Sequence, residues 1–288
     1  MTKTLSPVRS STRKPPIISG LPLLYPDAVA MKYWREINPI LSAMLAETER
    51  EVKALFDSPI AAKAGLPTMD DTPSISKRAK SLLDRLMNKY TRIFNRDLGN
   101  IVLDMMAGVD RSSALSLGGS LSKMGEALTV KADFLTGPMK EQFKAMTIDN
   151  VSLFKTIAST HFDKVETAVM NSIVSGNGLK DLKPFFDGHS NGTKNYGRLR
   201  ALDQTRKAFS SINAARMQKL GVKSFIWMHS HGSNEPRKLH ESYDGKVFEF
   251  DKPPVIYTEH GNEVRGLPGQ AIYCRCAMKP VFEFDDDE

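Results

Sequence analysis

The feature that most constrains this chain is a set of long segments in which apolar residues recur every three or four positions. This spacing places apolar side chains on one face of an α-helix, and that face must be buried against another element. Such segments cover residues 27–56, 74–106, 140–174 and 196–220. A chain of 288 residues is long enough to bury one large core or two modest ones. We therefore expect a mostly α-helical, elongated body.

Proline and glycine predict where these helices bend or end. Asn38 and Pro39 resemble a helix start, so residues 27–56 should form two helices or one kinked helix. Residues 186–195, rich in glycine and asparagine, are expected to form a loop before the last helix. Glycines after the other apolar segments are expected to end them: Gly108 the second, Gly176 and Gly178 the third, and Gly221 the fourth.

After Gly221 the pattern changes to alternation, which is typical of strands. In residues 222–231 one predicted face carries Phe225, Trp227, His229 and His231, and the other carries Ile226 and Met228. Further extended pieces are expected at residues 246–250, 255–257 and 271–284. The predicted fold class is α+β: the helical body is followed by a small mixed α/β domain, with Trp227 as a core anchor.

Four regions are predicted along the chain. Residues 1–26 are basic and rich in proline, and should form a flexible or extended arm. Residues 27–107 form an N-terminal helical region, and residues 108–220 form a central helical region. Residues 221–288 form the small α+β domain, which ends in the acidic tail Asp285 to Glu288.

The positive charge is distributed unevenly. The formal net charge is +7, and between Lys194 and Lys223 there are eight basic residues against one acid, Asp203. A basic row on a helix can hold DNA phosphates through the release of counterions. Alternatively, it is a solvated helix face. The candidate DNA-binding residues are Arg198, Arg200, Arg206, Lys207, Arg216, Lys219 and Lys223.

Membrane insertion and a secretory signal are not indicated by the sequence. No stretch approaches the roughly 18 apolar residues that span a bilayer, so we expect no membrane partner and synthesis in the cytoplasm. The two cysteines, Cys274 and Cys276, are one residue apart, and a disulfide between such close neighbours would be strained. That leaves metal ligation or plain packing for their thiols.

An ordered set of short motifs resembles the domain of phage Mu F-like head morphogenesis proteins. It opens with the segment from Ala201 to Lys207 and continues through residues 220–227, Arg237 with His240, the segment from Asp244 to Phe248, and Cys274 to Cys276. The similarity extends over residues 109–282. In many relatives an aspartate and a further arginine precede the histidine, and residues 233–240 of this chain lack both. The motif residues with expected structural roles are Asp203, Gln204, Trp227, Arg237, Gly245, Pro268, Gly269 and Arg275.

The resemblance implies a minor head (capsid) protein of a tailed bacteriophage. Such proteins act in head morphogenesis at the portal vertex or in the head interior, and in some cases in DNA packaging or ejection. The implied partners are the portal protein, the major capsid protein or both, with genomic DNA as a further candidate. The implied location is the head of the virion, after assembly in the host cytoplasm.

The histidines and cysteines could form either a structural site or a catalytic site. Cys274 and Cys276 could present two thiolates to a structural zinc ion, with His240 as third ligand and His229 or His231 as fourth. The alternative is a polar cluster without metal that stabilises the small domain. In the alternative nuclease hypothesis, a divalent ion for phosphodiester cleavage is held by His229, His231, His240 and Asp244. Because no general base and no phosphate-binding glycine loop accompany them, we expect a protein that is not an enzyme.

Overall fold

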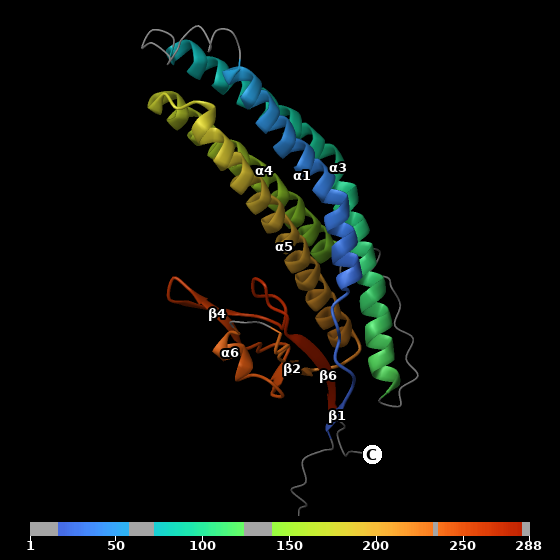
Figure 1. Ribbon diagram of the computed structural model, residues 1–288. Coiled ribbons are helices and arrows are strands. Elements are labelled where there is room, and N and C mark those ends of the chain that lie inside the picture. The colour runs from blue at the N-terminus through green and yellow to red at the C-terminus, as the bar shows by residue number, and fades with distance from the viewer. Residues whose placement is uncertain (1–16, 58–71, 124–139, 233–235, 284–288) are drawn as a thin grey trace, which may run out of the picture.

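The computed structural model describes residues 17–57, 72–123, 140–232 and 236–283, and its main feature is a curved bundle of four long helices (Figure 1). The helices are α1 (Asp27–Phe56), α3 (Thr72–Ser122), α4 (Lys140–Ser175) and α5 (Leu179–Lys219). Their apolar faces meet in one core, which includes Ile37, Leu41, Phe94, Val102, Phe154, Val165, Phe209 and Ile212. The predicted α+β class with a helical body is confirmed.

The C-terminal module (residues 221–283) lies at one end of the bundle, beside α5 (Figure 1). Its main sheet is antiparallel in the order β1-β6-β2-β3. The strands are β1 (Ile17–Ser19), β2 (Ser224–Met228), β3 (Val247–Glu249) and β6 (Ala277–Glu283). A short helix, α6 (Lys238–Glu241), precedes β3, and a separate hairpin joins β4 (Val255–Glu259) to β5 (Asn262–Arg265).

Of the two options predicted for residues 27–56, two separate helices is wrong, and the predicted loop at residues 186–195 is also wrong. Pro39 lies inside α1, because buried Ile37 and Leu41 continue the packed stripe on both sides of it. Residues 186–195, expected to form a loop, belong to α5, where Phe186 is fully buried. Packing against the other helices therefore outweighs the weak helix propensity of the glycines and asparagines.

The predicted end of the second helix at Gly108 is also wrong, because α3 continues to Ser122. Val109, Leu117 and Leu121 beyond this glycine are fully buried, so the continuation has its own apolar face. The other glycine predictions hold. α4 ends at Ser175, and α5 ends at Lys219 before Gly221, whose φ of 82° is the left-handed conformation typical of a residue after a helix.

The strand predictions hold in part. Phe225 and Trp227 are buried in β2, whereas Ile226 and Met228 are less buried, so the predicted faces are confirmed for the strand itself. β2 ends at Met228, before His229 and His231, and β6 begins at Ala277, after both cysteines. Strand β5 was not predicted; His260 and Gly261, both with positive φ, form the turn that joins it to β4.

The segment before α1 connects the bundle to the C-terminal module. β1 pairs with the end of β6, and Leu23 forms a bridge with Met278. The second half of the predicted arm is therefore part of the fold, whereas residues 1–16 and the acidic tail lie outside the described residues. None of the described helices is both long enough and apolar enough to cross a membrane.

Candidate functional site

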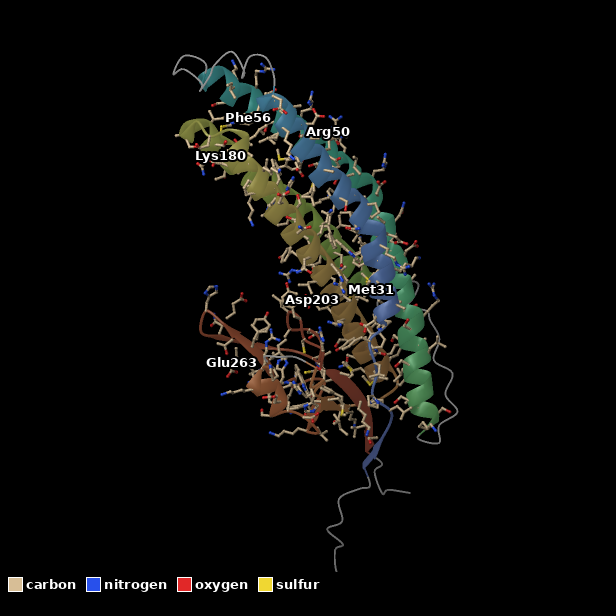
Figure 2. The ribbon with its side chains drawn as sticks, in the orientation of Figure 1. Met31, Arg50, Phe56, Lys180, Asp203 and Glu263 are labelled. Atoms are coloured by element: carbon tan, nitrogen blue, oxygen red, sulfur yellow. The ribbon has the colours of Figure 1, made fainter. Side chains whose placement is uncertain are left out.

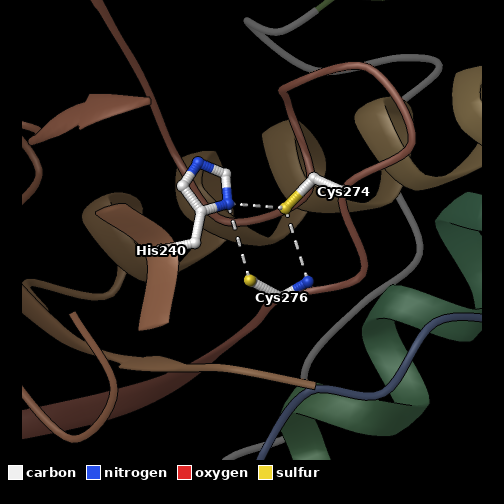
Figure 3. A group of neighbouring side chains, drawn as sticks. All are labelled: His240, Cys274 and Cys276. Atoms are coloured by element: carbon white, nitrogen blue, oxygen red, sulfur yellow. Dashed lines mark hydrogen bonds between the residues drawn. The ribbon is translucent and has the colours of Figure 1, made fainter. Parts of the chain in front are cut away.

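A histidine and two cysteines, distant in sequence, meet in the interior of the C-terminal module (Figure 3). Helix α6 carries His240, and the loop before β6 carries Cys274 and Cys276; all three are buried. His240 Nε2 lies 2.8 Å from the carbonyl oxygen of Ile256, so this nitrogen must hold the ring proton and donate it. The other ring nitrogen, Nδ1, faces the two sulfur atoms.

The spacing of these three atoms suits a tetrahedral metal. His240 Nδ1 lies 3.5 Å from Cys274 Sγ and 3.7 Å from Cys276 Sγ. With Zn–S bonds of about 2.3 Å and Zn–N bonds of about 2.0–2.1 Å, tetrahedral sulfur and nitrogen ligands lie about 3.5 Å apart. The bond from Nε2 to a backbone carbonyl is also typical of a metal-binding histidine, because it fixes the tautomer and the ring orientation.

The electrostatics of the two thiols differ. The hydrogen bond from the Cys276 thiol lowers the pKa of Cys274, and the His240 ring adds to this effect against the cost of burial. The same bond and burial raise the pKa of Cys276. Trp227 packs edge-on against His240, with ring centroids 5.0 Å apart, and so limits access of water to the group. Without a metal, the three residues therefore form a connected polar cluster.

The structure does not bring His229 into this group. Among the described residues the cluster of potential metal ligands contains only His240, Cys274 and Cys276. His229 lies instead against His231, with 3.3 Å between their Nδ1 atoms, and its backbone N–H donates to Asp244 Oδ1 at 2.7 Å. The predicted fourth ligand is thus placed elsewhere, because β2 ends before it and His231 turns the chain with a φ of 49°.

The four residues of the nuclease hypothesis are divided in the same way. His231 Nε2 lies 3.2 Å from Asp244 Oδ2 on the surface, whereas His240 faces the buried cysteines. Hydrogen bonds from the His229 backbone and the His231 ring lower the pKa of Asp244. Three of the four therefore form a separate cluster, in which His229 is buried and His231 and Asp244 are exposed, and this cluster does not meet the metal-site geometry found at His240.

Asp203 anchors the C-terminal module to α5 (Figure 2). Its side chain is buried, and Oδ1 accepts the backbone N–H of Tyr273 at 2.7 Å, while Arg200 and Lys207 approach Oδ2 at 3.6 and 3.4 Å. This bond holds Tyr273 at a φ of 58°, a strained conformation for an aromatic residue. An acid early in the motif thus fixes the loop that leads to the cysteines.

The other motif residues hold turns and loops of the module. Arg237 donates to the Ile272 carbonyl oxygen at 2.8 Å, and Arg275, which points away from the cysteine sulfurs, donates to that of Gly232 at 3.2 Å. Pro268 accepts a hydrogen bond from Ser210 of α5 at 2.6 Å. Gly245 and Gly269 both have positive φ, and Gln204 is buried on α5. All of these contacts lie within the module or join it to α5.

The candidate DNA-binding residues of α5 do not form one exposed row. Arg216 is buried in an ion pair with Asp110 of α3, and Arg206 pairs with Asp27 at 3.5 Å. Arg200 and Lys207 approach Asp203, as described above. The three remaining candidates are exposed: Arg198, Lys219 and Lys223. Most of the predicted row therefore neutralises acids within the fold.

One functional feature was missed from the sequence: the segment that ties the module to the bundle. Ser120 of α3 accepts the N–H of Leu21 at 2.7 Å and donates to its carbonyl oxygen at 2.9 Å. The Tyr25 hydroxyl donates to the carbonyl oxygen of Cys276, and the Arg206 guanidinium lies over the Tyr25 ring. The proline-rich composition of this segment masked its apolar residues.

Two comparisons found proteins that are similar to this chain. Residues 163–279 match the family described as Phage Mu protein F like protein. An uncharacterized protein of Haemophilus influenzae is 28% identical over 217 residues, which cover 75% of this chain and 46% of that protein. This chain thus spans about half the length of that relative. No solved structure matches. The matched region contains Asp203, the β2 strand and the His240–Cys274–Cys276 cluster, and it is similar to the Phage Mu protein F like family.

Proposed function

We propose that this protein is a minor head protein of a tailed phage, which acts in head morphogenesis at the portal vertex or in the head interior. The observation that carries the proposal is the family match over residues 163–279, which covers the end of α4, all of α5 and nearly all of the C-terminal module. Virion association, a low copy number and contact with the portal or major capsid protein are parts of the same proposal.

The architecture supports a structural role. The four helices form a long body with an extended lateral surface, and the C-terminal module is fastened to one end of it through Asp203, Ser120 and Tyr25. The residues of the nuclease hypothesis are divided between two separate clusters. We therefore propose that the protein has no enzymatic activity, and that incubation with plasmid DNA and magnesium, manganese or zinc leaves the DNA intact.

The location can be tested by isolating proheads and mature heads from cells that produce the phage. We expect the protein in both fractions at a few copies per head, and we expect it to bind the purified portal oligomer. A deletion of its gene should reduce the yield of normal heads, and expression of the gene in trans should restore it. Absence of the protein from both fractions would refute the proposal.

We also propose a structural zinc ion at His240, Cys274 and Cys276. The support is the agreement of the ligand spacing with tetrahedral geometry and the tautomer fixed by the Ile256 carbonyl oxygen. When bound, zinc would supply a cross-link between α6 and the loop before β6. The role is structural, because such a site adds folding energy to a domain with a small core.

Elemental analysis of the full chain, purified from zinc-supplemented cells, tests this site. We expect about one zinc per chain, its loss in the double variant Cys274→Ser with Cys276→Ser, and its retention in the control His229→Ala. Wild-type protein without zinc would show that the three residues form a polar cluster only. Loss of zinc in His229→Ala would show that this residue reaches the metal after all.

A further inference from the structure

A second row of basic residues lies on the first half of α3. Between Ile75 and Asn100 this helix carries two acids, Asp84 and Asp97, against seven cations. All seven cations are exposed: Lys77, Arg78, Lys80, Arg85, Lys89, Arg92 and Arg96. This half of α3 lies beside α1, at the end of the bundle away from the C-terminal module (Figure 1) and near Arg50 and Phe56 (Figure 2).

Helical spacing brings many of these cations onto one face. Arg85, Lys89, Arg92 and Arg96 follow one another at steps of four, three and four, and Arg78 lies seven positions before Arg85. With a rise of about 1.5 Å per residue, the row from Arg78 to Arg96 is about 27 Å long. The opposite face is fixed in the core by Leu83, Leu86, Tyr90, Phe94 and Leu98. The row is therefore held on a rigid support.

Only part of this charge is neutralised within the fold. Lys89 pairs with Glu47 at 2.6 Å, Arg85 with Glu51 at 3.7 Å, and Arg96 with its neighbour Asp97. Within the described part of the chain, four cations have no carboxylate within ion-pair distance: Lys77, Arg78, Lys80 and Arg92. On α5, by contrast, three cations of the predicted row lie beside buried acids: Arg200, Lys207 and Arg216.

A groove lies at the N-terminal end of this row, between α1 and α3. Lys77, Arg78 and Arg85 line it, together with Glu51 as its acidic group. We name the row together with this groove the α3 row.

We propose that the α3 row binds duplex DNA through its phosphates. Arginine, which binds phosphate in a bidentate manner, supplies four of the seven cations. The aromatic residues of this half-helix, Tyr90 and Phe94, are buried, so the row offers no rings on which single-stranded bases could stack. The chemistry therefore suits the backbone of a duplex, read without sequence preference. This inference goes beyond the proposed head function and does not depend on it.

The test is the fluorescence anisotropy of a labelled duplex of about 20 base pairs, titrated with the full chain at 50 and 200 mM salt. If four cations replace counterions, the slope of log affinity against log salt is about −3.6, and affinity falls about 150-fold over this range. The double variant Arg78→Gln with Arg92→Gln removes two of these contacts, so its affinity should fall only about 12-fold between the same salt concentrations.

The matched control is Arg198→Gln with Lys223→Gln, which removes two exposed cations from α5 and the following loop. It should keep the wild-type affinity and slope, and circular dichroism should show that both double variants remain folded. The proposal is overturned if the duplex does not bind at 50 mM salt, or if the control loses affinity while the α3 variant keeps it. Tighter binding of an acidic polypeptide than of the duplex would assign the row to an acidic protein partner instead.

Discussion

Replacing Arg216 with methionine should destabilise the helical body strongly, because it leaves a buried carboxylate without its cation. Arg216 of α5 donates through Nη1 to the Asp110 carbonyl oxygen at 2.8 Å and forms an ion pair through Nη2 with the Asp110 carboxylate. The two side chains are 6% and 4% exposed, so water cannot replace the lost partner. Breaking a buried pair by removing one member typically costs about 3–5 kcal/mol, and we expect a loss in this range.

A second variant separates this cause from a general packing defect. In Asp110→Leu with Arg216→Met the buried charge is gone together with its partner, and apolar groups of similar size fill the space. Replacing both members of a buried pair is often nearly neutral, so the double variant should recover most of the stability. The double variant should then be more stable than Arg216→Met by most of that loss, about 2–4 kcal/mol.

Urea denaturation followed by the circular dichroism of the helices measures both free energies of unfolding. The control is Arg198→Met, on the same helix but exposed, which should change the stability by less than about 0.5 kcal/mol. The reasoning fails if Arg216→Met costs less than about 1 kcal/mol, or if the double variant is as unstable as the single one. Either result would mean that the carboxylate of Asp110 is not held in the interior as described.

Three further predictions concern the junction and the bundle. Ser120→Ala removes both hydrogen bonds to Leu21 and should cost about 1–3 kcal/mol, with faster hydrogen exchange in β1; unchanged exchange would contradict this. Burial, and then the charge of His189, lower the pKa of His161 to about 3. Between about pH 6.5 and 3, the unfolded chain therefore binds a proton at His161, and the folded chain does not. The free energy of unfolding should then fall as the pH falls, by up to about 1.4 kcal/mol per pH unit. His161→Phe should flatten that part of a denaturation series. Gly269→Ala should lower the melting temperature, because φ is 87° and the new Cβ would collide with the Tyr25 hydroxyl; Gly192→Ala, in open space on α5, should not.

Local patterns in the sequence were sufficient for the helical body and for the start of the C-terminal module. Steps of three and four residues located the buried faces of α1, α3, α4 and α5, because each face is encoded within its own helix. Alternation located Phe225 and Trp227 on the buried face of β2 for the same reason. The spacing of Cys274 and Cys276 predicted that their thiols could share one ion, and the family motif supplied His240 as the third ligand.

Features that depend on distant partners could not be predicted. Gly108 does not end α3, because residues beyond it are buried against other helices. Arg216 seemed part of a DNA-binding row, because its acidic partner Asp110 lies 106 positions earlier in the chain. β1 pairs with residues more than 250 positions away, and nothing within residues 17–19 indicates such a partner. The cations of the α3 row stand in the sequence, but which of them have acidic partners depends on how α3 packs against Glu47 and Glu51 of α1.

The junction couples the candidate metal site to the helical body through one short loop. From the side of the bundle, Tyr25 donates to the Cys276 carbonyl oxygen, and Asp203 holds the N–H of Tyr273. From the side of the module, His240 faces both cysteine sulfurs. A metal that binds there would hold the same loop against α6, and the loop would then transmit the constraint to Tyr25 and so to β1. Loosening the cluster should therefore weaken the Tyr25 contact, while the pairing of β1 with β6 and the hydrogen bonds of Leu21 with Ser120 continue to hold the N-terminal segment. The sheet of the module therefore joins strands from opposite ends of the described chain, β1 from its start and β6 from its end.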